Sequence, residues 1–170
     1  MIVSKYVERV LSSNPNCAAI IEYPVGASIL LKELEEKFTN YGVSRIEFAV
    51  MKSLSHAYTL SADVIIVENP VSLGRGRAWK IYPSTESYRY LEGSRITIAE
   101  AKTGSKSSDL KSGIGQLIMY SKIICMELET NLKRDIPISM ELIIPVEERN
   151  NINPLINSVC DLLHIRIVLV

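Results

Sequence analysis

The 170-residue chain is poor in the residues that mark disulfide-rich and metal-binding domains. It has three cysteines and two histidines, and none of them follows a CxxC, HxxxH or HExxH spacing. A scattered, odd-numbered set of cysteines argues against a disulfide framework and against a zinc or iron–sulfur site. We therefore expect the cysteines to be small buried side chains in a reducing compartment, and both histidines to be structural.

Long apolar runs and a net charge are also missing. No stretch approaches the roughly 18 consecutive apolar residues of a membrane helix, and residues 1–16 lack the apolar core of a signal peptide. These absences predict a cytoplasmic protein that has no membrane partner. The 19 Lys and Arg residues balance 19 Asp and Glu residues, which argues against a protein that coats nucleic acid indiscriminately.

The composition that remains is that of one folded domain. Hydrophobic residues make up 47% of the chain, which excludes a disordered protein, and eight Gly with seven Pro exclude low-complexity sequence. Because no Pro/Ser-rich linker divides the chain, we expect a single domain over residues 1–170. Within it, residues 41–170 would form the core and residues 1–40 a helical N-terminal extension.

Apolar spacing predicts an alternation of helices and strands. Helices are expected over residues 2–13, 29–42, 43–55, 113–132 and 152–164, and strands over residues 17–25, 63–67, 95–104, 137–146 and 165–170. The segments RAWKIY and SYRYLE, between residues 68 and 93, are typical of strands or a hairpin arm. This order predicts an α/β fold with a mixed central sheet and helices on both faces. The apolar segment 165–170 would be an edge strand suited to pairing in a homodimer.

Acidic residues in apolar strands need a reason, because burying a charge is costly. Asp63 precedes the apolar run VIIV, and Glu100 and Lys102 stand two apart in ITIAEAKTG, so the latter two share one face of a strand. Two carboxylates on adjacent strands would form a hard oxygen site for Mg²⁺ or Mn²⁺. A lysine beside that site can position a water and stabilise phosphate charge. A partly exposed ion pair on an edge strand is the alternative.

The order of Asp63, E-x-K-T-G from Glu100 and Q-x-x-x-Y from Gln116 resembles the PD-(D/E)xK nuclease superfamily, and most of all its RecB-type branch. The resemblance spans residues 43–125 and implies a restriction-endonuclease-like fold and a metal-dependent nuclease that hydrolyses DNA. It implies that Asp63 and Glu100 bind Mg²⁺ or Mn²⁺ and that Lys102 assists the attacking water. Gln116 and Tyr120 share a helix face and would position the lysine or the substrate phosphate; a solvated Gln116 and a core Tyr120 are the alternatives.

The same resemblance implies a further acid on the first core helix, where Glu47 is suitably placed. Its competitors are Glu33, Glu35 and Glu36, and a solvated helix face would explain any of the four. Two features depart from the family pattern. The residue before Asp63 is alanine rather than proline, and the 37 positions from Asp63 to Glu100 require an insertion or an extra hairpin.

Basic residues gather around these motifs. Residues 71–122 contain nine basic and four acidic side chains, a net charge of +5. We expect DNA-backbone contacts from Arg75, Arg77, Lys80, Lys106 and Lys111. Four aromatic side chains suited to base stacking are interleaved with them: Trp79, Tyr82, Tyr88 and Tyr90. A solvated hairpin with ordinary aromatic packing would explain the same pattern.

Two other functions fit parts of the sequence. Residues 30–38 and 43–54, joined by a short turn, could form a helix-turn-helix, which would make the protein a DNA-binding regulator. However, the second segment is strongly apolar and offers only Arg45 and Lys52 as basic groups. The third interpretation is a nuclease fold that binds DNA or assembles with other proteins without cleaving, since a fold does not fix a function.

Overall fold

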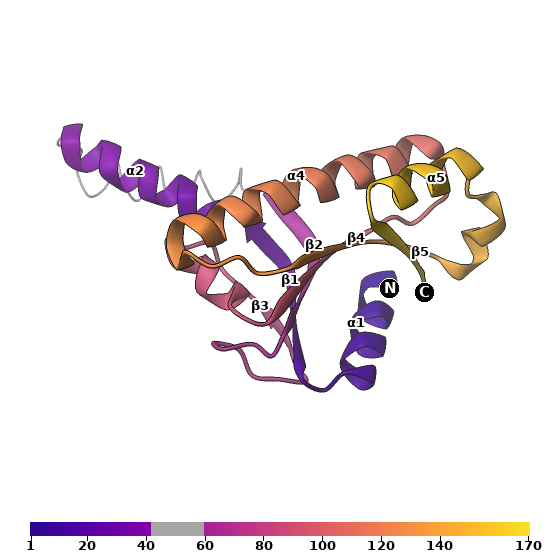
Figure 1. The fold of residues 1–170 in the computed structure, drawn as a ribbon, viewed down its shortest axis with the longest axis horizontal. Helices are drawn as coiled ribbons and strands as arrows, with labels where there is room; N and C mark the ends of the chain where they lie inside the picture. The colour runs from indigo at the N-terminus through magenta and orange to yellow at the C-terminus, as the bar shows by residue number, and fades with distance from the viewer. Residues whose placement is uncertain (42–59) are drawn as a thin grey trace.

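A mixed sheet forms the centre of the molecule in the computed structural model, which describes residues 1–41 and 60–170 (Figure 1). Its strands are β1 (Cys17–Val25), β2 (Leu60–Glu68), β3 (Ala78–Lys80), β4 (Arg95–Ala101), β5 (Ile138–Ile144) and β6 (Ile165–Leu169). The helices of the described residues are α1 (Ile2–Ser13), α2 (Ala27–Tyr41), α4 (Ser107–Leu132) and α5 (Pro154–Leu162), with 3₁₀ helices η1 (Ser87–Leu91) and η2 (Val146–Asn151).

The strand order across the sheet is β3-β1-β2-β4-β5-β6 in the part of the chain that the structure describes. The pairs β1–β2 and β2–β4 are antiparallel, and the pairs β1–β3, β4–β5 and β5–β6 are parallel. The predicted α/β fold with a mixed sheet flanked by helices is confirmed. β6 stands at one edge of the sheet, as the sequence suggested for residues 165–170.

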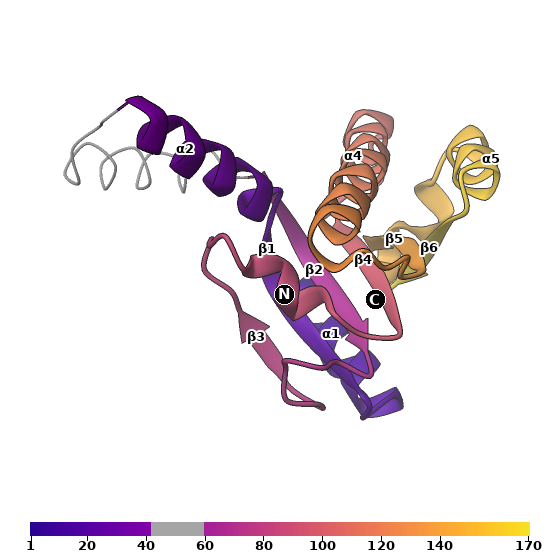
Figure 2. The same ribbon diagram turned by 60° about the vertical axis from the view of Figure 1, so that its left-hand side comes forward.

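Helices cover both faces of the sheet, which explains why its central strands are apolar in both directions. α1 packs on one face through Tyr6 and Val7, and α4 and α5 pack on the other through side chains such as Leu117 and Ile156 (Figures 1 and 2). In β2, residues 64–67 are all buried, as expected for a strand covered on both sides.

Residues 1–40 are not the peripheral extension that the sequence suggested. The strand predicted at residues 17–25 is present as β1, and it lies inside the sheet between β3 and β2. Ala18 and Ile20 of β1 belong to the same hydrophobic core as α4. An apolar strand pattern indicates that a strand exists, but it does not identify the neighbours with which the strand pairs.

The facing residues Glu22 in β1 and Asp63 in β2 interrupt the normal alternation of side chains. The register between the two strands is the same on either side of this pair, yet Ile20 and Tyr23, three residues apart, both pack in the core beneath α4. In β2, Ala62 and Ile65, which are three residues apart on either side of Asp63, likewise both pack in this core. Glu22 accommodates this shift with a φ of 55°, which is uncommon outside glycine. We call the Glu22–Asp63 pair the seam.

α2 projects from the body of the molecule and is anchored at its first turn (Figures 1 and 2). The carboxylate of Glu127, buried in α4, accepts hydrogen bonds from the Ser28 hydroxyl at 2.7 Å, the Ser28 amide at 3.3 Å and the Tyr23 hydroxyl at 3.5 Å. A carboxylate at a helix N-terminus satisfies free amides and complements the helix dipole. Burial raises the pKa of Glu127, while these hydrogen bonds oppose the rise.

The segment between residues 68 and 93 is only in part what the sequence suggested. Residues 78–80, within RAWKIY, form β3, but SYRYLE forms η1 rather than a strand. The buried Ser87 accepts a hydrogen bond from the Ser84 amide at 2.9 Å and donates one to the Ser84 carbonyl at 3.0 Å. Such local side-chain bonds favour a turn over an extended strand.

α4 begins earlier than its apolar pattern predicts. The helix starts at Ser107, and Lys106 stands at its N-cap position without a side-chain cap. Among the helices of residues 1–41 and 60–170, none has the length and apolar character needed to cross a membrane.

Candidate functional site

Asp63 stands where β2 and β4 separate. Their antiparallel pairing runs as far as Val64 opposite Ala99. One residue beyond, Oδ2 of Asp63 accepts the backbone N–H of Ala101 at 2.8 Å. The carboxylate therefore takes an amide that a backbone carbonyl would take in an uninterrupted sheet. This bond, together with the shift at the seam, fixes Asp63 between the two strands.

Glu100 is a buried carboxylate on the side of the sheet that α4 covers. It is 3% exposed, and its Oε1 accepts a hydrogen bond from the ammonium group of Lys102 at 3.0 Å. Its Oε2 is buried and has no hydrogen-bond partner among the described residues. Burial raises the pKa of Glu100, the negative charge of Asp63 adds to the rise, and the bond with Lys102 opposes it.

Lys102 links the strand to the helix above it. Its ammonium group donates to Glu100 and also to the Oε1 of Gln116 in α4, at 2.7 Å. The co-facial placement of Glu100 and Lys102 is thus confirmed, but β4 is a central strand, so the edge-strand alternative does not hold. A half-buried lysine with two acceptors has a fixed direction, which exposed lysines lack.

Gln116 and Tyr120 continue this chain of hydrogen bonds along α4. The amide nitrogen of Gln116 lies 3.3 Å from the Tyr120 hydroxyl, and Tyr120 is 3% exposed. Burial raises the pKa of Tyr120, and the charges of Glu100 and Asp63 raise it further. Tyr120 therefore belongs both to the core, as one alternative held, and to the polar chain that begins at Glu100.

Gly113 makes room for Lys102 and was not identified from the sequence. A Cβ atom on Gly113 would lie 2.8 Å from Lys102 Cε and 2.8 Å from Leu142 Cδ1. Gly113 precedes Gln116 by three positions and therefore lies on the same helix face. That spacing is the signal by which the sequence could have revealed it.

A hollow of about 190 Å³ opens beside Lys102. Thr103, Asp109 and Ser112 line it together with the lysine. Ser112 lies one helical turn before Gln116, so its place could have been predicted from the helix periodicity. Thr103 lies in the loop between β4 and α4, which has no periodic pattern, and Asp109 lies in the first turn of α4, before the residues whose apolar spacing predicted the helix.

The candidate acids differ in how the structure places them. Glu47 lies outside the described residues, as does the second helix of the helix-turn-helix interpretation. Its competitors Glu33, Glu35 and Glu36 are exposed on α2. Within residues 1–41 and 60–170, no group of three or more His, Cys, Asp or Glu side chains is placed to hold a metal ion.

The five basic residues proposed for DNA contact fall into two groups. Lys106 and Lys111 are exposed at the start of α4, next to the loop that carries Lys102. Arg75, Arg77 and Lys80 are exposed at the β3 edge of the sheet, where Lys80 pairs with Glu22 at 2.6 Å. Only the α4 group lies close in the chain to the residues of the candidate site. We call this site the Asp63–Tyr120 cluster; it consists of Asp63, Glu100, Lys102, Gln116 and Tyr120.

The chain was compared with protein-family models, curated proteins and solved structures, and none of these comparisons found a match. The geometry of the Asp63–Tyr120 cluster is therefore the basis on which a function can be inferred.

Proposed function

We propose that this protein is a metal-dependent nuclease of restriction-endonuclease-like fold that hydrolyses phosphodiester bonds in DNA. The observation that carries the proposal is Oε2 of Glu100, a buried carboxylate oxygen without a hydrogen-bond partner among the described residues, beside Asp63 and Lys102. An unpartnered buried oxygen is costly for a fold and calls for a reason. A cation bound during function supplies that reason.

The donor set fits Mg²⁺ or Mn²⁺. Asp63 and Glu100 offer hard carboxylate oxygens, and Mg²⁺ in phosphoryl-transfer sites is commonly held by one or two carboxylates, with waters and substrate phosphate completing its shell. When bound, such an ion lowers the pKa of a water and neutralises phosphate charge.

The protein's own groups would orient the reactants around that ion. Lys102, fixed by Glu100 and Gln116, presents a positive charge that stabilises charge developing on the phosphate and directs the attacking water. Tyr120 holds Gln116 and therefore positions the lysine indirectly. Lys106 and Lys111, at the start of α4, would contact the DNA backbone next to the scissile phosphate, and the β3 group would contact it farther away.

The test is cleavage of labelled single-stranded, duplex and branched DNA with Mg²⁺, with Mn²⁺ and with EDTA. Asp63→Asn retains an acceptor for the Ala101 amide, and Glu100→Gln retains the shape of the side chain. We expect each variant, and Lys102→Met, to lower metal-dependent cleavage by about a hundredfold or more. Glu129→Gln, the same charge change at an exposed position of α4, should cleave like the wild type.

Metal binding provides a second measurement that does not require cleavage. Calorimetric titration with Mn²⁺ should detect one site in the wild type and in Glu129→Gln, and much weaker binding in Asp63→Asn. Equal cleavage by the wild type and by Glu100→Gln would contradict the proposal. Salt-sensitive DNA binding without cleavage, unaffected by Asp63→Asn, would instead identify a DNA-binding or assembly protein.

A further inference from the structure

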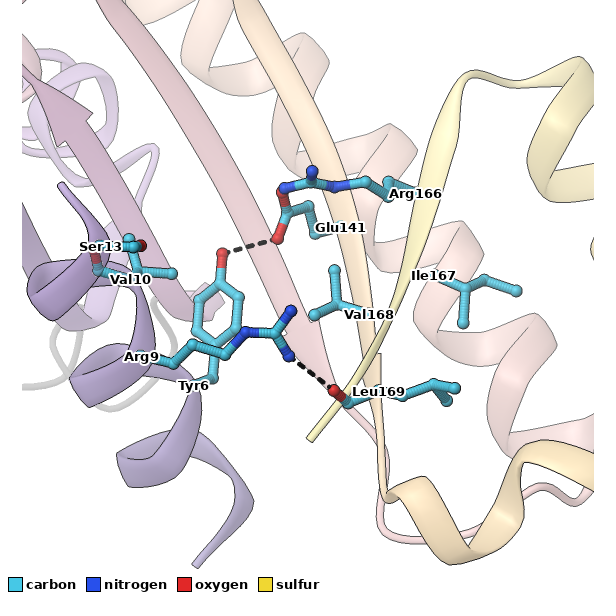
Figure 3. A pocket seen from close by; sticks show the side chains of 9 residues that line it. All are labelled: Tyr6, Arg9, Val10, Ser13, Glu141, Arg166, Ile167, Val168 and Leu169. Carbon is cyan, nitrogen blue, oxygen red and sulfur yellow. Dashed lines mark hydrogen bonds and ion pairs between the residues drawn. The ribbon is translucent and has the colours of Figure 1, made fainter.

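A second polar site lies on the opposite face of the sheet, beneath α1. Two hollows of about 430 and 410 Å³ are both lined by Glu141 of β5 and Arg166 of β6, so they adjoin at these two side chains. The first hollow lies between α1 and β6 (Figure 3). The second lies over β4, β5 and β6. Neither is lined by residues of the Asp63–Tyr120 cluster.

Glu141 holds an arginine at the junction of the two hollows. It is 4% exposed, its Oε2 accepts a hydrogen bond from the Tyr6 hydroxyl at 2.8 Å, and its Oε1 pairs with the guanidinium group of Arg166 (Figure 3). The side chain of Arg166 is nonetheless 73% exposed. A guanidinium group has five N–H donors, so most of those on Arg166 remain directed away from Glu141.

Two further arginines, from other elements, stand around the same hollows. Arg9 of α1 donates to the carbonyl oxygen of Leu169 at 2.9 Å, which holds its guanidinium group across the first hollow (Figure 3). Arg95 of β4 lines the second hollow, and in the part of the chain that the structure describes it makes neither an ion pair nor a side-chain hydrogen bond. Three arginines thus meet two acids here: Glu141, which pairs with Arg166, and Glu68, which faces Arg95 in the register of β2 and β4. One positive charge is therefore in excess.

The two hollows have both polar and apolar lining residues in addition to the charged ones. Hydroxyl-bearing Thr97 and Ser139 line the second hollow, and apolar Val10 and Val168 line the first. Guanidinium groups bind phosphate and carboxylate oxygens in pairs, and hydroxyl groups can complete such a shell. Each hollow is of the size that holds a small organic ligand, and the apolar walls suit the body of that ligand.

We propose that this face binds a small organic oxyanion, a phosphate monoester or a polycarboxylate, held in the first hollow by Arg9 and Arg166. The site is separate from the proposed nuclease centre and does not depend on that activity. Arg166 is anchored by a buried carboxylate, and Arg9 is anchored by a backbone carbonyl, so both are oriented before a ligand arrives. Such preorganisation reduces the entropy cost of binding.

Calorimetric titration at constant ionic strength, with inorganic phosphate, AMP and citrate as probes, tests the proposal. The wild type should bind AMP or citrate saturably, with a Kd of about 1 mM or tighter. Arg9→Gln should weaken that binding about tenfold, the effect of losing one charge-assisted hydrogen bond, and Arg95→Gln, in the second hollow, should weaken it less. Arg89→Gln, an equal charge change on η1 outside the hollows, should leave it unchanged.

The probes also separate the sources of the oxyanion. Binding of AMP and phosphate but not citrate assigns a phosphate ester, and binding of citrate alone assigns a polycarboxylate. The proposal is overturned if none of the three probes binds saturably, or if Arg89→Gln weakens binding as much as Arg9→Gln. It is also overturned if the Arg9 effect appears only with a single-stranded oligonucleotide, which would make this face a nucleic-acid surface.

Discussion

Two buried glutamates on neighbouring strands, Glu100 and Glu141, are alike in burial and in forming an ion pair, but they differ in how many of their carboxylate oxygens have hydrogen-bond partners. They are 3% and 4% exposed, they face opposite sides of the sheet, and each forms an ion pair, with Lys102 and Arg166 respectively. Both oxygens of Glu141 have partners, whereas Oε2 of Glu100 has none among the described residues.

The difference separates a carboxylate that holds the fold together from one that retains binding capacity. Glu141 uses its oxygens to join α1 to β6 through Tyr6 and Arg166, so its charge is fully used within the protein. Glu127 is similar, because it is hydrogen-bonded to the start of α2. One oxygen of Glu100 has no partner among the described residues, and this is the oxygen that we propose binds the metal ion. Burial alone would not distinguish these residues; the hydrogen-bond partners do.

Replacing each glutamate with leucine should give the largest contrast. Glu141→Leu leaves the hydroxyl of the buried Tyr6 without its acceptor, and we expect the free energy of unfolding to fall by about 1–3 kcal/mol. Glu100→Leu removes Oε2, which has no partner among the described residues, together with Oε1, whose donor Lys102 keeps Gln116 as an acceptor. Its loss of stability should therefore be smaller than that of Glu141→Leu, while metal-dependent cleavage is lost. Urea denaturation and the DNA assay measure the two effects.

A second substitution tests whether the stranded hydroxyl causes the loss of stability. Tyr6→Phe in the Glu141→Leu background removes the stranded hydroxyl and should recover part of the lost stability, because a pair replaced by apolar groups on both sides is nearly neutral. Equal destabilisation by Glu100→Leu and Glu141→Leu would remove the distinction between the two glutamates.

A smaller effect should distinguish two glycines of α4. An alanine at Gly113 would meet the flexible Lys102 side chain at 2.8 Å, whereas at Gly115 no atom lies within 4 Å. Gly113→Ala should displace Lys102 and lower cleavage by about ten- to a hundredfold, with a stability loss of about 1 kcal/mol. Gly115→Ala should retain activity and gain up to about 1 kcal/mol from helix propensity.

Parallel DNA-cleavage and thermal-unfolding assays on the two glycine variants make this comparison. Unchanged cleavage by Gly113→Ala would show that the position of Lys102 does not matter for activity, and it would weaken the role assigned to the lysine.

The smallest effect concerns pH. The folded-state pKa of Glu100 is raised above its ordinary value of 4.5, so the folded protein holds this proton to higher pH than the unfolded chain does. Without metal, stability should therefore fall as pH rises above about 4.5 and level off once the folded-state pKa is passed. Glu100→Gln should reduce this slope, and Glu129→Gln, which replaces an exposed acid, should not.

Chemical denaturation at several pH values between about 5 and 8 measures the slope. Glu127 has a raised pKa as well, so Glu127→Gln should remove a further part of the slope. Saturating Mg²⁺ should flatten it in the wild type but not in Glu100→Gln, because a bound cation favours the ionised carboxylate. A slope that is identical in all variants would place its origin elsewhere.

The sequence predicted the elements better than their arrangement. Strong apolar patterns located β1, β2, β4, β5 and β6 within a few residues, and the spacing of Glu100 and Lys102 predicted that they are neighbours. The 3₁₀ turn at η1 was missed because it depends on the hydrogen bonds of one serine, Ser87. The central position of β1 was missed because strand patterns do not specify partners.

The candidate site was predictable only where it follows a periodic pattern. Gln116 and Tyr120 lie on one helix face, and their contact follows from that spacing. Gly113 and Ser112 share the same periodicity, but their roles cannot be inferred from spacing alone. The role of a small side chain becomes evident only when the residue packed against it is known. The surroundings of Glu100, whose Oε2 has no partner among the described residues, depend on the packing of β4 against β2 and α4, which no local pattern encodes.

The seam between Glu22 and Asp63 has a consequence for how this sheet is assembled. If both residues were deleted, the alternation within β1 and β2 would become regular, and every flanking side chain would keep its face and its partner. In terms of side-chain alternation, Glu22 and Asp63 are therefore one extra residue in each of two otherwise regular strands, placed opposite each other. The carboxylate that we propose as a metal ligand belongs to one of these extra residues, so the sheet's own hydrophobic pattern does not depend on it.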